Sequence, residues 1–266
     1  MKKLTVREII ARKKEGKPLV VLTAYDALWS TLLEESGIEL VLVGDSLGMV
    51  SLGYEATTPV TMEEMIHHAK AVRRGAPTCF LIGDMPFLSY HISPEESVRN
   101  AGRFMKEAGC DAVKIEWYPS LIRMVQAMIS AGIPVMGHVG LTPQTASQLG
   151  GYKVQGREKR KAGEILKGAI ELEKAGCFSI VLECIPSHLA KKITQQVKIP
   201  TIGIGAGIEC DGQVLVTQDL LGLFDRFVPK FVKPYAKMKI SASKAIRAFK
   251  EEVETKKFPS VAHSFI

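Results

Sequence analysis

Eight short apolar runs recur along the 266-residue chain, and a stretch with helical spacing follows nearly every one of them. Few of the runs alternate apolar and polar residues, which is typical of strands that are buried on both faces. Strands joined by helices pair in parallel, so the pattern predicts an α/β fold. The runs are residues 19–24, 40–43, 79–82, 112–116, 134–137, 179–182, 201–204 and 214–217.

Eight strand–helix repeats in a chain of this length favour a closed (β/α)8 TIM barrel that forms one domain over residues 1–266. The alternative is a doubly wound open sheet. No GxGxxG motif follows the first apolar run, and the glycines at 203, 205 and 207 come too late and too close together for a dinucleotide-binding turn. The barrel is therefore the preferred fold.

The sequence also predicts several helices, some of them from the residues that cap their ends. Residues 5–15 predict a short N-terminal helix, and Thr61 with Glu64 forms a capping box for a helix over 61–74. Further helices are expected at 26–36, from Ser93 to about Gly109, and at 119–131, 157–175, 187–197 and about 230–255.

Composition excludes some classes of protein. No apolar run is long enough to span a bilayer, and the N-terminus lacks the apolar core of a signal peptide, so the cytoplasm is the expected location. Five cysteines without CxxC spacing fit reduced thiols. A net charge of +7 with only 7% aromatic residues indicates a solvated basic surface rather than a nucleic-acid interface, and positive charge would steer anionic substrates.

Charged side chains stand at the carboxyl ends of the apolar runs. In the run 112–116, Lys114 and Glu116 share one face of the strand, and a buried charge is costly unless it has a partner or a function. An internal Lys114–Glu116 ion pair is the simpler interpretation. The same kind of ending recurs on other strands, which favours a shared site, because catalytic groups of such barrels sit at the carboxyl ends of the strands.

Three acids follow three successive strands, namely Asp45, Asp84 and Glu116. Neighbouring strands of a barrel would bring these carboxylates together. Oxygen donors without cysteine suit a hard cation such as Mg²⁺ better than zinc. Each acid taken alone could instead cap the helix that follows it.

A fourth acid, Glu183, follows the sixth run among apolar residues, where desolvation would make its carboxylate a usable general base; it could also cap a loop. His138 could bind substrate or cap a loop, and Tyr25 also lies at a strand end; both are candidates for a supporting shell around the site. His67 and His68 are expected on a helix surface. A metal, a lysine and a base together suggest enolate chemistry on an α-keto acid, with the metal chelating the keto and carboxylate oxygens.

Motifs from the first strand to the last helix give the chain a close resemblance to the ketopantoate hydroxymethyltransferase family. They are LTAYD (22–26), VGDSLGMVSLGYEATTPVTMEEMIHHAKAV (43–72), GDMPF (83–87), AVKIE (112–116), PVMGHVGLTPQ (134–144), LECIP (182–186), IGIGAG (202–207) and KFVKPYA (230–236). The resemblance implies a (β/α)8 barrel of the phosphoenolpyruvate/pyruvate superfamily, acting in pantothenate biosynthesis.

The implied reaction moves a hydroxymethyl group from the co-substrate 5,10-methylenetetrahydrofolate to 3-methyl-2-oxobutanoate, giving 2-dehydropantoate through a Mg²⁺-stabilised enolate. By resemblance, one Mg²⁺ per subunit is held by Asp45, Asp84 and Glu116, with some contacts running through water in the family. Asp45, Ser46, Asp84 and Lys114 contact the keto acid, and Glu183 accepts the proton. The family also implies a homodecamer. Loop 139–156 and the segment after the seventh strand are candidates for the pterin site by position alone.

Two rival functions remain. The first is a carbon–carbon lyase or phosphomutase of the same superfamily, which would share the metal site. Such enzymes usually carry a cysteine on a mobile loop. The loops after the second and fifth runs of this chain have no cysteine, which argues against this rival. A catalytically silent barrel that binds keto acids or a partner would not need Glu183. Nucleic-acid binding is a more distant alternative.

Overall fold

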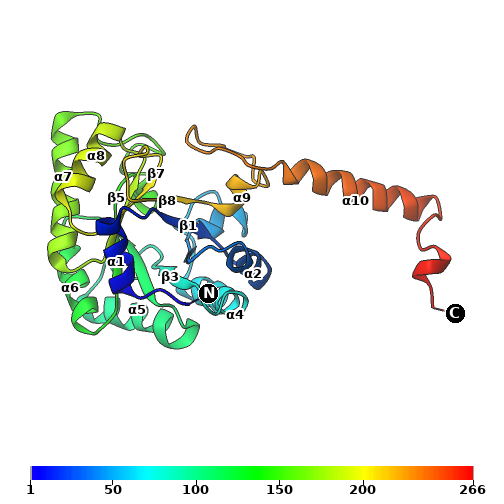
Figure 1. Cartoon of the computed structure of the whole chain (residues 1–266), viewed down its shortest axis with the longest axis horizontal. Coiled ribbons are helices and arrows are strands. Elements are labelled where there is room, and N and C mark those ends of the chain that lie inside the picture. The colour runs from blue at the N-terminus through cyan, green and yellow to red at the C-terminus, as the bar shows by residue number, and fades with distance from the viewer. Residues whose placement is uncertain (1, 266) are drawn as a thin grey trace. The chain divides into compact units, whose positions relative to one another are not determined.

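The computed structural model describes residues 2–265, which fall into two compact units, one up to Val216 and one from Thr217. The first unit holds a closed barrel of parallel strands in the order β1 to β8, with β8 pairing back onto β1. Figure 1 shows helices α4 to α8 outside this ring of strands. The strands are β1 (Leu19–Thr23), β2 (Leu40–Val43), β3 (Phe80–Asp84), β4 (Ala112–Glu116), β5 (Val135–Gly140), β6 (Ser179–Glu183), β7 (Thr201–Ile204) and β8 (Gly212–Leu215).

Helices alternate with these strands, and the expected barrel with its N-terminal helix is confirmed. The helices of the first unit are α1 (Val6–Glu15), α2 (Ala27–Glu35), α3 (Leu47–Val50), α4 (Met62–Gly75), α5 (Pro94–Ala108), α6 (Ile122–Ser130), η1 (Pro143–Thr145), α7 (Lys159–Ala175) and α8 (Ser187–Gln196).

Alternation along each strand divides the core into two layers. On β5, Met136 belongs to the cluster that fills the barrel, whereas Val135 and Val139 belong to the cluster between the barrel and its helices. Polar residues that alternate in step with Met136 therefore enter the barrel interior. His138 is one of these, which decides where its ring lies.

Helix α1 closes the amino-terminal end of the barrel. Ile9 is fully buried in the interior cluster, and Thr5 with Glu8 forms a capping box at the start of the helix. Lys13 pairs with Asp211 at 2.6 Å and Arg12 with Glu39 at 2.8 Å, and both acids lie just before barrel strands. This end is held by ion pairs and apolar contact.

Some predicted boundaries were wrong. The eighth strand begins at Gly212 rather than at 214, because Gly212 pairs with Leu19 and Ile202, and a Cβ at Gly212 would meet the Leu19 carbonyl oxygen at 2.4 Å. A strand that starts on a glycine has no apolar signal at its start. The last helix begins at Met238 rather than near 230, since Pro234 lacks an N–H donor and restricts the residue before it.

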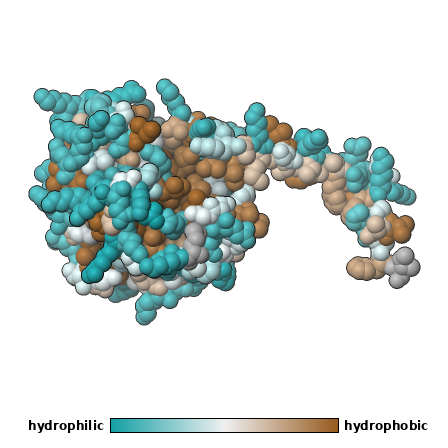
Figure 2. All heavy atoms as spheres, viewed as in Figure 1, coloured by the Kyte–Doolittle hydropathy of each residue, from teal (hydrophilic) through white to brown (hydrophobic). Residues whose placement is uncertain are grey.

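The second unit contains α9 (Thr217–Leu220), α10 (Met238–Glu254) and η2 (Val261–His263). No residue of α10 is buried, and hydrophobic side chains lie among hydrophilic ones along it, including Ile246, Phe249 and Val253 (Figure 2). The barrel is complete by Leu215, and a single domain over the whole of 1–266 stays a prediction. Within residues 2–265, no helix combines the length and apolarity that crossing a membrane requires.

Candidate active site at the carboxyl end of the barrel

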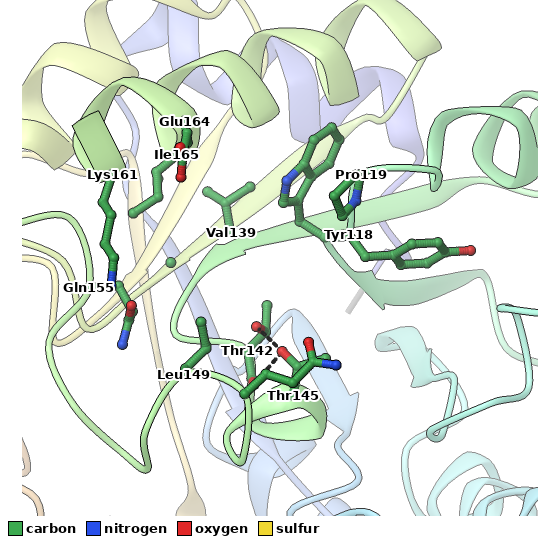
Figure 3. A pocket seen from close by; sticks show the side chains of 13 residues that line it. Tyr118, Pro119, Val139, Thr142, Thr145, Leu149, Gln155, Lys161, Glu164 and Ile165 are labelled. Atoms are coloured by element: carbon green, nitrogen blue, oxygen red, sulfur yellow. Dashed lines mark hydrogen bonds between the residues drawn. The ribbon is translucent and has the colours of Figure 1, made fainter.

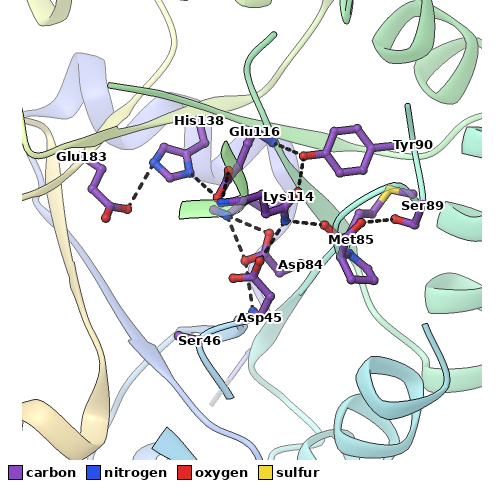
Figure 4. Close-up of polar contacts among 12 residues, drawn as sticks. Asp45, Ser46, Asp84, Met85, Ser89, Tyr90, Lys114, Glu116, His138 and Glu183 are labelled. Atoms are coloured by element: carbon purple, nitrogen blue, oxygen red, sulfur yellow. Dashed lines mark hydrogen bonds and ion pairs between the residues drawn. The ribbon is translucent and has the colours of Figure 1, made fainter. Parts of the chain in front are cut away.

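Polar side chains from five neighbouring strands meet at the carboxyl end of the barrel (Figure 4). Parallel strands all end on the same side, so residues far apart in sequence become neighbours in space. Ser46, at the start of the short helix α3, lies beside them. The side chains come from Asp45 after β2, Asp84 on β3, Lys114 and Glu116 on β4, His138 on β5 and Glu183 on β6.

Lys114 and Asp84 form a buried ion pair. The ammonium Nζ lies 2.7 Å from Asp84 Oδ1 and 2.9 Å from Oδ2, and both side chains are almost completely buried. Burial alone would lower the pKa of Lys114, but the carboxylates of Asp84 and its neighbours outweigh burial and raise that pKa. Lys114 therefore pairs across to β3, and not with Glu116 as the simpler interpretation of β4 held.

Asp45 lies against this pair. Its backbone N–H donates to Asp84 Oδ2 at 3.3 Å, and its own Oδ2 accepts a hydrogen bond from Gln144 Nε2 at 2.8 Å. The Asp45 residue is 4% exposed. The carboxylates of Asp45 and Asp84 are thus adjacent, and the Lys114 ammonium is the positive charge beside them.

Glu116 is the acid with unused bonding capacity. Its Oε2 accepts from the Gln144 backbone N–H at 3.0 Å, whereas Oε1 has no hydrogen-bond partner among the described residues. Burial raises the pKa of Glu116 well above its usual range; Lys114 opposes this rise, and the charges of Asp45 and Asp84 add to it. An unpaired oxygen and crowded negative charge are what a cation would relieve.

His138 stands between two carboxylates. Its Nδ1 lies 3.6 Å from Glu116 Oε1, and its Nε2 lies 3.2 Å from Glu183 Oε2, but neither contact meets the geometry of a hydrogen bond. Burial, assisted by Lys114, lowers the pKa of His138 despite the opposing influence of Glu183. The ring is therefore neutral near pH 7 and carries one proton for two acidic neighbours.

Glu183 faces the cluster from β6 and is its most accessible acid. Its side chain is 16% exposed, compared with 3% for Glu116, and it meets His138 rather than the purely apolar surroundings that the sequence predicted. Its backbone carbonyl oxygen accepts from Leu141 N–H at 2.9 Å. A carboxylate that solvent and a small molecule can reach suits a base better than a buried one.

Tyr25 and Ser46 support the opposite side of the site. The Tyr25 hydroxyl and Ser46 Oγ are 2.8 Å apart, and the Tyr25 carbonyl oxygen lies 2.6 Å from His68 Nδ1. His68 is therefore half-buried behind the site, and its expected place on the surface was wrong; His67 is exposed.

The residues fit a divalent cation in their chemistry. Four carboxylates face one ammonium, and carboxylate oxygens are the donors that Mg²⁺ prefers. In this conformation, however, no three His, Cys, Asp or Glu side chains of residues 2–265 are grouped closely enough to hold a metal ion. The Lys114 ammonium occupies both oxygens of Asp84, so the predicted trio is gathered at one end of the barrel but not yet arranged as a coordination shell.

The sequence interpretation gave no role to Gln144 or Tyr90. Gln144 was present in the motif GLTPQ, but no charge or spacing marked it, and Tyr90 lies between two helical signals without a pattern. Both are buried and bonded to the acids. Burial raises the pKa of Tyr90 well above its usual value, so its hydroxyl keeps its proton.

A separate cavity of about 240 Å³ lies outside the barrel wall (Figure 3). Val139 lines it and points away from the interior that His138 enters, so β5 separates this cavity from the acids. The cavity is walled by loop 139–156 and the first turns of α7. Its other lining residues include Trp117, Tyr118, Thr142, Thr145, Gln155 and Lys161.

Solved structures with this fold are known enzymes. Phosphonopyruvate hydrolase in complex with oxalate and Mg²⁺ superposes with a TM-score of 0.63 at 14% identity, covering 99% of this chain and 93% of that one. A 2,3-dimethylmalate lyase of the PEP mutase/isocitrate lyase superfamily superposes with a TM-score of 0.63 at 15% identity, covering 96% and 89%. At this level of identity the likeness shows the fold, so the class of protein that the structure defines is a closed (β/α)8 barrel with a cluster of acids at the carboxyl ends of its strands.

Sequence comparison identifies the family within that class. The family model described as ketopantoate hydroxymethyltransferase matches residues 3–261. The 3-methyl-2-oxobutanoate hydroxymethyltransferase of Heliobacterium modesticaldum is 55% identical over 99% of this chain and 96% of its own length; that of Syntrophus aciditrophicus is 52% identical over 100% and 97%. The chain belongs to the ketopantoate hydroxymethyltransferase family, a family of transferases.

Proposed function

We propose that this enzyme transfers a hydroxymethyl group from 5,10-methylenetetrahydrofolate to 3-methyl-2-oxobutanoate, giving 2-dehydropantoate, the first committed step of pantothenate biosynthesis. Family membership at 55% identity supports the acceptor substrate. One observation supports the chemistry: the same barrel opening holds an accessible carboxylate, Glu183, on one side and the buried Lys114–Asp84 ion pair on the other.

The reaction begins with loss of the C3 proton from the keto acid. Glu183 takes this proton, because it is the acid of the cluster that a ligand in the barrel mouth can reach. The C3 carbon of the resulting enolate then forms a bond to the methylene carbon of the folate, and both bonds from that carbon to the folate nitrogens break. Water supplies the oxygen of the new hydroxyl group. Of the two water hydrogens and the proton taken from C3, two go to the folate nitrogens, which releases tetrahydrofolate, and one stays on the hydroxyl group. His138, neutral and adjacent to Glu183, restricts the orientations that the Glu183 carboxylate can adopt.

The charge that develops during enolisation is offset by residues of this chain. Lys114 faces the negative charge of the enolate and of the substrate carboxylate, and its charge persists because the surrounding acids raise its pKa. Ser46, aligned by the Tyr25 hydroxyl, offers a neutral hydrogen bond to the keto acid.

Asp45, Asp84 and Glu116 are the proposed ligands of one Mg²⁺ per subunit. A bound Mg²⁺ supplies Lewis-acid stabilisation of negative charge on the keto oxygen. The unpaired Oε1 of Glu116 and the excess of carboxylates support this assignment. For Asp84 to join, the Lys114 ammonium would move from Asp84 toward the substrate carboxylate.

The first prediction concerns proton removal. In deuterated water with Mg²⁺, the enzyme should exchange the C3 proton of 3-methyl-2-oxobutanoate even without folate, and EDTA should stop the exchange. Glu183→Gln should still bind the keto acid but lose exchange by about 10²-fold or more. Proton NMR measures the exchange and calorimetry the binding.

Glu158→Gln, a change at an exposed acid on the surface, is the matched control and should exchange at the wild-type rate. Undiminished exchange in Glu183→Gln would remove Glu183 from the role of base. No exchange in the wild-type enzyme despite keto acid binding would favour the silent barrel.

The proposal extends to the setting of the enzyme. By family resemblance we expect a cytoplasmic homodecamer that acts on small molecules and binds neither membrane nor nucleic acid. The exposed apolar side chains on α10 are consistent with association. Sedimentation velocity of the full chain distinguishes ten subunits of 29.1 kDa from a monomer.

A further inference from the structure

Gln144 touches two of the proposed metal ligands from a third element. It lies in η1, after β5, and is 4% exposed. Its backbone N–H donates to Glu116 Oε2 at 3.0 Å, and its side-chain Nε2 donates to Asp45 Oδ2 at 2.8 Å. Asp45 follows β2 and Glu116 ends β4, so one residue bridges two acids that are not on adjacent strands.

The orientation of the Gln144 amide is determined by its surroundings. Nε2 also donates to the Met85 carbonyl oxygen at 2.9 Å, and a carbonyl can only accept. The Tyr90 hydroxyl accepts from the Glu116 N–H at 3.1 Å and donates to Gln144 Oε1 at 2.8 Å. Both hydrogens of the amide nitrogen and the amide oxygen are therefore hydrogen-bonded. If the amide were flipped, its oxygen would face the Asp45 carboxylate and the Met85 carbonyl oxygen, which can only accept.

This arrangement occupies one oxygen of Glu116 and directs the other. Oε2 is held by Gln144, whereas Oε1 has no hydrogen-bond partner within the described chain. The amide holds the acids without adding charge, so it does not compete with a cation as a lysine would.

We propose that Gln144, clamped by Tyr90, is a positioning residue that presets Asp45 and Glu116 for the divalent cation. Hydrogen bonds of this kind orient ligands before the ion arrives and reduce the cost of ordering them. The inference rests on the proposed function, because it assumes that these acids bind a metal.

Metal affinity tests the proposal independently of catalysis. Mn²⁺, titrated into the metal-free full-length enzyme and followed by electron paramagnetic resonance, should bind Gln144→Ala about 10- to 100-fold more weakly than wild type. Tyr90→Phe, which keeps the ring and removes the clamp, should weaken Mn²⁺ binding in the same direction by a smaller factor. Saturating Mn²⁺ should restore most of the proton exchange in both variants.

Gln148→Ala is the matched control, since Gln148 is an exposed glutamine of the same loop. It should bind Mn²⁺ as wild type does. Wild-type affinity in both Gln144→Ala and Tyr90→Phe would overturn the inference and leave the proposed reaction intact, even if the thermal midpoint fell. Failure of the wild-type enzyme to bind Mn²⁺ would overturn the proposed metal site together with the inference. If Gln144→Ala does not fold, Tyr90→Phe decides alone.

Discussion

At the scale of the residue, the Lys114–Asp84 pair shows how this site differs from the surface of the molecule. Pairs such as Lys250–Glu254 lie in water, where an ion pair contributes little to stability. Lys114 and Asp84 are 6% and 3% exposed, so each charge depends on the other for the solvation it has lost. A buried pair is seldom the most stable filling of such a space, so the role proposed above for the Lys114 charge would account for the pair better than packing does.

Removing one partner should expose this dependence. Lys114→Met leaves Asp84 with a buried, unpaired carboxylate, and the free energy of unfolding of the metal-free protein should fall by about 3–5 kcal/mol in urea denaturation. The double variant Lys114→Met/Asp84→Leu should recover most of that loss, while both variants lose proton exchange. Equal stability of Lys114→Met and wild type would contradict the buried pair.

At the scale of the element, β5 and its loop serve both sides of the site. The strand turns His138 into the barrel and then ends at Gly140, where φ is 104°. A Cβ at Gly140 would lie 2.2 Å from the Glu183 carbonyl oxygen, so only glycine allows β5 to pass this close to β6. The loop then brings Gln144 back to the acids.

Substitution at Gly140 should therefore disturb the proposed base. Gly140→Ala combines backbone strain with a clash, and we expect a loss of unfolding free energy above about 2 kcal/mol and slower proton exchange from displacement of Glu183. Gly150→Ala is the comparison, because Gly150 also has positive φ, at 77°, but a Cβ there meets nothing within 4 Å. It should cost about 1 kcal/mol and leave exchange unchanged. Similar behaviour of the two variants would show that the close approach to Glu183 is unimportant.

At the scale of the whole molecule, the barrel divides its tasks between its two ends. The carboxyl end gathers charges that are only partly paired, at a cost to stability. The amino-terminal end carries caps and satisfied pairs, including the contact of Glu34, at the end of α2, with Thr78, just before β3. Glu34 Oε1 accepts from both the N–H and the hydroxyl of Thr78 at 2.7 Å.

The Glu34 contact predicts a pH-dependent contribution to stability. Burial alone would raise the pKa of Glu34, but hydrogen bonds, first those from Thr78 and then those from Cys79, outweigh burial and lower this pKa below its usual 4.5. A lowered pKa stabilises the fold above that usual value, and the stabilisation disappears as the pH falls through the folded-state pKa. At pH 7, Glu34→Gln should reduce the free energy of unfolding by about 1 kcal/mol, and the difference should vanish in acid.

Urea denaturation from pH 7 downward measures this, with Glu35→Gln, at the exposed neighbouring acid, as control. Proton exchange at pH 7 should be unaffected in both variants, because Glu34 lies at the end of the barrel away from the site. A pH-independent difference for Glu34→Gln would show that the carboxylate charge is not what binds Thr78.

The repeat of apolar run and helix determined the barrel by itself. Strands β2, β4 and β7 were predicted to the residue, because strands buried on both faces form short runs of mainly apolar residues, although β4 also carries Lys114 and Glu116. The acids at the strand ends could be found for the same reason, since charge stands out against an apolar run and a parallel barrel brings strand ends together. The roles of those acids stay predictions.

Only the tertiary structure decided which charges pair and what holds them. Lys114 turns to Asp84 because β3 is its neighbour in the barrel, whereas the sequence placed Glu116 nearest to it. Gln144 and Tyr90 are neutral and lie outside the strands and long helices. Their hydrogen bonds to each other and to Asp45 depend on distances in space, which the periodicity of the sequence does not reveal. Hydrophobic burial acts through patterns that can be read along the chain; hydrogen bonds depend on direction and on contact in space.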